Sequence, residues 1–272
     1  MTQASIVDLH NHLLPCVDDG SRSTAESLEY LETWARQGVA AITFTPHLVL
    51  YELSTDNDID ARLNALSDAF EAFLYRTSGR TDIPALALGQ EVCARNAEEM
   101  TRVASNPRVG LGGTDYVLVE LGFSPGYDAA GVIEAARAAG RRIVLAHPER
   151  YAFGLGVSPV DEVLRWRDAG ALIQVNGGSL QGRYTTMATE IAGQLLREDA
   201  IAIISSDHHG RSRPHDPVDA FEALATSIGT ERTNELMSVR TSRIRTGAPV
   251  TEPAEMDERV RASGPGHATR VA

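Results

Sequence analysis

Short apolar runs alternate with longer amphipathic stretches along most of the chain. Seven runs typical of buried strands lie at residues 6–9, 41–45, 85–89, 116–119, 142–146, 172–175 and 201–205. Between them, apolar residues recur at helical spacing. The clearest case is 56–75, with Ile59, Leu63, Leu66, Phe70 and Phe73 at steps of three or four. Because each strand is followed by a helix, the strands are expected to pair in parallel.

Residues typical of helix ends support these boundaries. Ser23 and Glu26 form a capping-box pattern at the start of a helix that Gly38 closes. Ser158 and Pro159 are a favoured N-cap and first helical residue. Further helices are expected after residue 96, over 129–139, 158–170, 186–197 and 231–239, and from about residue 217.

This pattern predicts an α/β fold. Seven strand–helix units within roughly 240 residues suggest a barrel related to the (β/α)₈ type, and an open doubly wound sheet is the alternative. Residues 1–248 are expected to form one domain. The segment 249–272 loses the periodicity and is rich in Pro, Gly and Glu, so we expect a disordered or loosely docked tail.

Polar residues with metal-binding side chains follow six of the seven predicted strands. His10 and His12 are two residues apart after the first strand, so their imidazoles would project together. In parallel α/β folds, the carboxyl ends of strands are where active sites form. The nine candidate ligands are His10, His12, Asp19, His47, Glu91, Glu120, His147, Asp207 and His209. Spacing alone does not separate Asp19 from Asp18, and His208 would alternate away from Asp207 and His209.

Five imidazoles and four carboxylates exceed the four to six ligands of one ion, so two or three divalent ions are expected. Nitrogen and oxygen donors without thiolate suit Mn²⁺, Fe or Zn²⁺. Three divalent ions, four carboxylates and a bridging hydroxide sum to about +1, inside a protein whose formal net charge is −12. Such a site is able to bind an anion despite the acidic exterior.

Four arginines follow these strand ends and suit bidentate phosphate binding, with surface salt bridges as the alternative. They are Arg150, Arg183, Arg211 and Arg213. Cys16 and Arg22 also fit the C-x₅-R pattern of thiol-based phosphatases. The loop between them carries Asp18 and Asp19, which repel both a thiolate and a phosphate, so we do not favour that mechanism.

Composition narrows the class of protein. The chain has 272 residues, of which 43% are hydrophobic and 23% charged. It contains no basic run for nucleic acid and no apolar stretch long enough for membrane insertion, and residues 1–5 lack the charged start of a signal peptide. A cytoplasmic location is expected. The two cysteines make no disulfide framework, so reduced thiols are expected.

Several motifs together resemble the PHP (polymerase and histidinol phosphatase) superfamily. Within it, they resemble the metal-dependent protein-tyrosine phosphatases of bacterial capsule and exopolysaccharide loci. The matching stretches, over about residues 6–215, are DLHNHLLPCVDDGSRSTAESLE, FTPHL, GQEV, LVEL, AHPERY, GGSLQGRY and SSDHHGRSRP. The resemblance implies a distorted seven-stranded, TIM-like barrel with a trinuclear site. It selects Asp19 over Asp18 and His209 over His208.

The resemblance also places Arg150 and Arg213 where the phosphate is expected. Two departures stand out. The loop before Arg213 is about one residue short, so Arg211 and Arg213 are hard to tell apart, and His47 is followed by unusually apolar residues, Leu48 to Leu50. The tail has no recognisable counterpart.

We therefore expect a metal-dependent phosphomonoesterase, with a protein-tyrosine phosphatase linked to capsule or exopolysaccharide regulation favoured. A metal-bridging hydroxide would attack phosphorus. Manganese is the preferred ion, with Fe, Zn²⁺ or Mg²⁺ as alternatives. The expected partner is a phosphotyrosine protein such as a bacterial tyrosine-kinase tail. Alternatives are a phosphatase of a small phosphoester such as histidinol phosphate or a nucleotide, and a non-catalytic metal-binding partner. The physiological substrate and the oligomeric state are not specified by the sequence.

Overall fold

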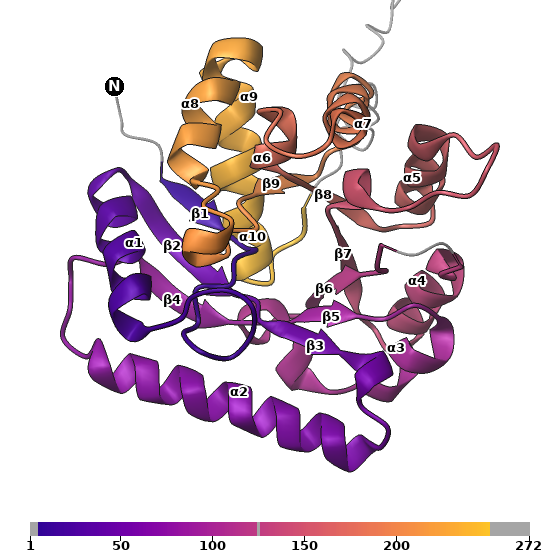
Figure 1. Cartoon of the computed structure of the whole chain (residues 1–272). Coiled ribbons are helices and arrows are strands. Elements are labelled where there is room, and N and C mark those ends of the chain that lie inside the picture. Colours follow the sequence, from indigo (N-terminus) through magenta and orange to yellow (C-terminus); the bar gives the residue numbers. More distant parts are fainter. Residues whose placement is uncertain (1–4, 124–125, 251–272) are drawn as a thin grey trace, which may run out of the picture.

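The computed structural model describes residues 5–123 and 126–250, in which parallel strands are surrounded by helices (Figure 1). Every strand pair is parallel, as expected. One sheet has the order β1 (Ile6–Asp8), β2 (Val39–Phe44), β4 (Ala85–Leu88). The other has the order β3 (His47–Val49), β5 (Glu91–Cys93), β6 (Tyr116–Glu120), β7 (Arg142–Ala146), β8 (Leu172–Asn176), β9 (Ile203–Ser205).

Two of the expected strands, 41–45 and 85–89, are each followed after a two-residue break by a further short strand that was not predicted. The described residues therefore form nine strands in two sheets rather than seven in one. β3 follows β2 after a two-residue break that contains Pro46, which has no N–H to donate to a ladder. β5 follows β4 after Gly89 and Gln90. The break is bridged by hydrogen bonds from Gly89 N to Phe44 O (2.8 Å) and from Glu91 N to Pro46 O (3.2 Å). The two chain segments therefore stay paired across the break, as β2 with β4 before it and as β3 with β5 after it.

The ring of strands closes between the segments that follow β1 and β9. Asp207 N donates to His10 O and His12 N donates to His208 O, both at 2.8 Å. The buried carboxylate of Asp8 accepts from Ser206 N at 2.8 Å and from the Ser206 hydroxyl at 2.7 Å. This closure confirms the barrel-like fold over the open sheet.

The helices agree closely with the expected boundaries. The longer ones are α1 (Thr24–Arg36), α2 (Asp56–Arg76), α3 (Ala97–Ala104), α4 (Ala129–Ala138), α5 (Pro159–Asp168), α7 (Thr186–Arg197) and α8 (Pro217–Ile228). Short helices are α6 (Gly177–Leu180), α9 (Thr230–Asn234) and α10 (Arg240–Arg245). The expected helix over 231–239 is longer, because a π turn at Glu235–Val239 links α9 to α10.

One cap differs from the prediction. The Ser23 side chain accepts from Glu26 N at 3.1 Å, as expected. The Glu26 carboxylate, however, accepts from Arg22 N (3.0 Å) and Arg211 N (2.8 Å), so it joins the loop after β9 to α1 instead of closing a capping box. A complete capping box is present at Thr55 and Asp58, at the start of α2.

Two apolar clusters are built from alternate residues of the same strands. Val117 and Val119 of β6 pack in the larger cluster between strands and helices, whereas Leu118 packs in the smaller one. That smaller cluster fills the barrel and includes Ile244 of α10. The apolar filling leaves the carboxyl ends of the strands for polar side chains. Within residues 5–123 and 126–250 no helix has the length and apolarity needed to cross a membrane. Of the expected tail, residues 249–272, the part from residue 251 onward lies outside the described residues.

Candidate metal centre

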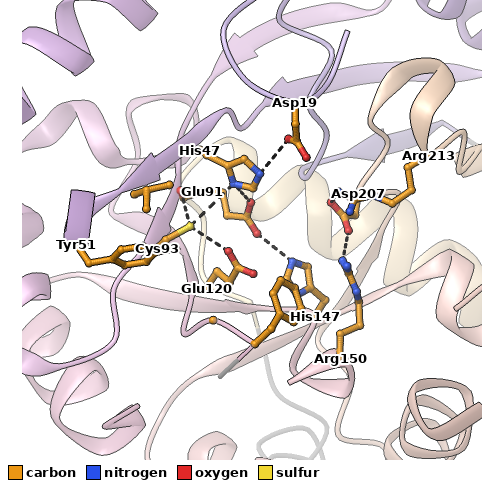
Figure 2. A pocket seen from close by; sticks show the side chains of 13 residues that line it. Asp19, His47, Tyr51, Glu91, Cys93, Glu120, His147, Arg150, Asp207 and Arg213 are labelled. Carbon is orange, nitrogen blue, oxygen red and sulfur yellow. Dashed lines mark hydrogen bonds and ion pairs between the residues drawn. The ribbon is translucent and has the colours of Figure 1, made fainter. Parts of the chain in front are cut away.

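A cavity of about 230 Å³ opens at the carboxyl ends of the strands (Figure 2). All nine residues expected as ligands lie in or beside it. Their donor atoms fall into overlapping groups in which the atoms lie within 4.8 Å of one another. The groups are His12, Asp19, His47 and His209; His10, His147 and Asp207; His10, His12 and Glu91; Glu91, Glu120 and His147; and His47, Cys93 and Glu120. Six of the seven predicted strand ends thus deliver their side chains to one place.

Glu91 occupies the middle of this cluster. Its Oε1 lies 3.2 Å from His10 Nε2 and 3.0 Å from His147 Nε2, and its Oε2 lies 2.8 Å from His47 Nδ1. Burial alone would raise the pKa of Glu91, but His10 and His47 outweigh it and hold the pKa well below its usual value. The carboxylate is therefore charged and surrounded by nitrogen donors.

Asp19 approaches from the other side, on the loop after β1. Its Oδ1 lies 3.3 Å from His47 Nε2 and 3.4 Å from His209 Nε2, and its side chain is 65% exposed. The His12 and His209 rings stack with centroids 3.8 Å apart. Four side chains from three separate parts of the chain thus converge on one point.

Partners outside the cluster orient two of the imidazoles. Asp18 Oδ2 lies 2.8 Å from His12 Nδ1, and Gln174 Oε1 lies 2.9 Å from His10 Nδ1. Each contact occupies Nδ1 and leaves Nε2 to face the cluster, which is how metal-binding histidines are commonly held. Asp18 and Asp19 are thereby distinguished. The sequence analysis did not identify Gln174. It could have been found as a polar residue within an otherwise apolar strand, two residues before Asn176 and therefore on the same side of the strand.

Two of the four non-glycine residues with positive φ in the described part of the chain lie at the same place, and the other two are Cys16 and Asp199. His147 has φ 34° and Asp207 has φ 52°, a left-handed conformation that is costly for residues other than glycine. Such strain persists where surrounding structure fixes it, and it clusters at functional sites. Here it turns both side chains toward the cavity as their strands end.

The donor set fits divalent cations. Burial and the neighbouring Glu91 raise the pKa of Glu120 to about 7, because two close carboxylates repel without a cation. His147 Nδ1 is buried and lacks a hydrogen-bond partner among the described residues. Unpaired buried groups of this kind are costly unless a ligand satisfies them.

The arginines divide into two pairs. Arg150 lines the cavity, lies 2.5 Å from Asp207 Oδ2 through Nη1, and stacks 4.4 Å above the Tyr184 ring. Arg213 lines the cavity beside the His209 ring. Arg183 instead pairs with Asp219 (3.1 Å) and Arg211 with Glu29 (2.9 Å), and neither lines the cavity. The geometry thus favours Arg213 over Arg211.

The remaining sequence candidates lie apart from the cluster. His208 packs its ring against Tyr30 and Trp34, and its Nδ1 contacts His215 O at 3.0 Å. Cys16 is exposed, and its thiol donates to the backbone carbonyl of Arg22 at 2.9 Å. Within the C-x₅-R stretch, the cysteine therefore contacts the backbone of Arg22 and not its guanidinium group. Cys93, Tyr51 and Phe123 also line the cavity, and the sequence analysis did not anticipate them.

The same fold occurs in known proteins. A crystal structure from work on YwqE of Bacillus subtilis and CpsB of Streptococcus pneumoniae, described as unique metal-dependent tyrosine phosphatases, superposes with a TM-score of 0.71. The match covers 90% of this chain and 96% of that one, at 24% identity. A β-aspartyl dipeptidase from Fervidobacterium islandicum gives a TM-score of 0.51 at 12% identity, over 92% of this chain and 76% of its own.

Curated relatives agree in sequence. The tyrosine-protein phosphatase YwqE of Bacillus subtilis is 28% identical over 230 residues, 83% of this chain and 86% of its own. The putative tyrosine-protein phosphatase CapC of Staphylococcus aureus is 27% identical over 207 residues, 75% and 77% of the two chains. The family model described as capsular polysaccharide synthesis, CpsB/CapC, matches residues 6–244. These matches confirm the resemblance found in the motifs: the chain belongs to the CpsB/CapC family of capsular polysaccharide synthesis proteins.

Proposed function

We propose that this chain is a metal-dependent phosphomonoesterase that hydrolyses phosphotyrosine in proteins. The observation that carries the proposal is the convergence of nitrogen and oxygen donors from six strand ends on a cavity that two arginines also line. Family relatives named tyrosine-protein phosphatases support the same activity.

The proposed ligands are the nine residues identified from the motifs: His10, His12, Asp19, His47, Glu91, Glu120, His147, Asp207 and His209. They would hold two or three divalent ions, with Mn²⁺ preferred and Fe, Zn²⁺ or Mg²⁺ as alternatives. Such ions, when bound, neutralise phosphate charge and make coordinated water acidic. Asp18 and Gln174 fix the ring orientations of His12 and His10.

Arg150 and Arg213 are proposed to bind the phosphate. Arg150 uses Nη1 on Asp207 and keeps further N–H donors for an anion. Its guanidinium is fixed between the rings of Tyr184 (4.4 Å) and Phe123 (5.0 Å), which limits its conformational freedom. A fixed guanidinium stabilises charge that develops on phosphate oxygens without first having to reorganise.

Half-exposed aromatic residues support an aryl phosphate as substrate. Tyr51 is 49% exposed and Phe123 is 50% exposed, and both line the cavity. The Phe123 ring lies parallel to the His147 ring, with planes 10° apart and centroids at 5.9 Å. Apolar ring faces beside a charged cluster suit a phenyl group whose phosphate points inward. A small polar metabolite would leave these rings uncovered.

Hydrolysis of p-nitrophenyl phosphate and of a phosphotyrosine peptide tests the proposal. We expect activity in metal-loaded protein, loss on chelation with recovery on adding metal, and loss in His147→Ala. Cys16→Ser is the matched control and should keep full activity, since Cys16 is outside the cluster. Activity abolished by Cys16→Ser, but insensitive to chelation and to His147→Ala, would contradict the metal mechanism.

A further inference from the structure

Cys93 lies in the cavity without a role in the proposed function. It ends β5, two residues after Glu91, so both side chains leave the strand on the same side. The residue is 4% exposed and lines the same cavity. In Figure 2 its sulfur is joined to both His47 and Glu120.

The distances around this sulfur are those of a ligand group. Sγ lies 3.0 Å from Glu120 Oε2 and 4.0 Å from His47 Nδ1. In a tetrahedral site, with bonds of about 2.3 Å to sulfur and 2.0–2.1 Å to nitrogen or oxygen, donor atoms are separated by about 3.6 Å. The two observed distances bracket this value. Small side-chain rotations would therefore bring all three donors to one ion.

A second observation in the same cavity points to a cation. Glu120 also belongs to the group with Glu91 and His147. Glu91 Oε2 is buried 2.8 Å from His47 Nδ1, yet it forms no hydrogen bond within the described part of the chain. Two neighbouring buried carboxylates, one with an oxygen that accepts no hydrogen bond, are costly unless a positively charged ligand compensates them. Cys93 is thus part of a polar cluster and not of the packed core.

The other cysteine lacks these features. Cys16 is exposed, contacts a backbone carbonyl, and belongs to none of the ligand groups. The Cys93 thiol instead donates to the Glu120 carboxylate, which is itself a proposed ligand. The ordinary hydrogen bond and metal ligation therefore make different predictions.

We propose that Cys93 is a sulfur ligand of the ion held by His47 Nδ1 and Glu120. Ligation forms one metal–sulfur bond and releases the thiol proton to solvent, without oxidation or reduction. A thiolate shifts the preference of this position toward Zn²⁺, Fe²⁺ or Co²⁺ and away from the Mn²⁺ expected from nitrogen and oxygen donors alone. This inference rests on the metal centre of the proposed function.

Cobalt spectroscopy on the full-length chain tests the proposal. Metal-free wild type, Cys93→Ser and Cys16→Ser are titrated with Co²⁺, and absorption is recorded in the visible and near ultraviolet. We expect visible cobalt bands in all three proteins. The thiolate-to-cobalt charge-transfer band should appear in wild type and Cys16→Ser and be absent from Cys93→Ser.

The outcomes separate the two proposals. Visible bands without a charge-transfer band in wild type, or with the same band in Cys93→Ser, would overturn the role of Cys93 alone. Absence of cobalt binding in wild type would overturn the metal centre as well. X-ray absorption of Zn²⁺-loaded Cys16→Ser requires no change at Cys93. Its spectrum should contain a sulfur scatterer at about 2.3 Å, and one with only nitrogen and oxygen would contradict the proposal.

Discussion

Adjacent residues of one type have different environments when the chain turns between them. The Asp18 carboxylate is 4% exposed and contacts His12 Nδ1, whereas that of Asp19 is 65% exposed and faces His47 and His209. We predict that Asp19→Asn removes a direct ligand and lowers the number of ions bound per chain. Asp18→Asn should keep that number and weaken affinity about 10–100-fold, as loss of an orienting partner does. Metal content after dialysis and metal titration distinguish the two, and equal effects would contradict the assignment.

Two arginines provide a matched pair for phosphate binding. Arg150 lines the cavity, whereas Arg211 pairs with Glu29 on the surface. We predict that Arg150→Lys lowers kcat/KM for a phosphotyrosine peptide by about 10²–10³-fold, because an ammonium group loses the planar fork that binds two oxygens. Arg211→Lys should stay within about twofold, since an exposed pair contributes little. Similar losses in both variants would show that surface charge, and not position, is responsible.

Phe123 provides a residue-level test of substrate class. If its half-exposed ring contacts the phenyl group of the substrate, Phe123→Leu should lower kcat/KM for p-nitrophenyl phosphate by about 5–20-fold, the equivalent of about 1–2 kcal/mol of aromatic contact. Hydrolysis of an alkyl phosphate such as glycerol phosphate should change much less. Parallel losses on both substrates would indicate damage to Arg150, which the ring also contacts.

At the level of elements, the apolar pattern predicted the strands and helices well and missed the breaks. β3 and β5 have three residues each, too short to register as separate periodic runs. Their existence depends on pairing with each other, which is a tertiary effect. Cys93 was overlooked for this reason, because the third strand was expected to end at residue 89 and nothing predicted that residues 91–93 would pair again beside the cavity.

The segment between β9 and α8 contains His215, a buried histidine whose protonation is expected to make stability depend on pH. Burial lowers the pKa of His215 to about 4, and both ring nitrogens lack hydrogen-bond partners among the described residues. As pH falls below about 6.5, the unfolded chain gains a proton at this position that the folded chain does not, so stability is lost between about pH 6.5 and 4. The group thus contributes stability at neutral pH.

We predict that His215→Gln loses about 1–2 kcal/mol less stability than wild type when pH falls from about 7 to 5. Urea unfolding of both proteins with chelator present measures this, since the histidines proposed as metal ligands then contribute equally to both. Parallel slopes for His215→Gln and wild type would contradict the burial argument.

At the scale of the whole molecule, the cluster was predictable from sequence because parallel strands direct their carboxyl ends to one face. His10, Glu91 and His147 could be placed from strand ends alone. The arginines could not, because their direction depends on distant partners. Arg211 turns toward Glu29 of α1 and Arg183 toward Asp219 of α8, contacts that cross 182 and 36 residues of sequence. Periodicity carries no information about such pairs.

Because of the same convergence, ions bound at the proposed centre would link the two sheets of the barrel and stabilise it. Its donors come from both sheets, with His10 and His12 after β1 of one sheet and Glu91 and His147 from the other. An ion that binds these donors only when they are assembled stabilises the fold by RT ln(1 + [M]/Kd), about 2.7 kcal/mol at 100 times Kd and about 4.1 at 1,000 times. We predict that added metal raises the free energy of unfolding of chelator-treated protein by this amount, which shifts the urea midpoint by that energy divided by an unchanged m value. Cys16→Ser should respond fully and Asp19→Asn less. An identical midpoint with and without metal would mean that the cluster is assembled by packing alone and binds no ion that spans the two sheets.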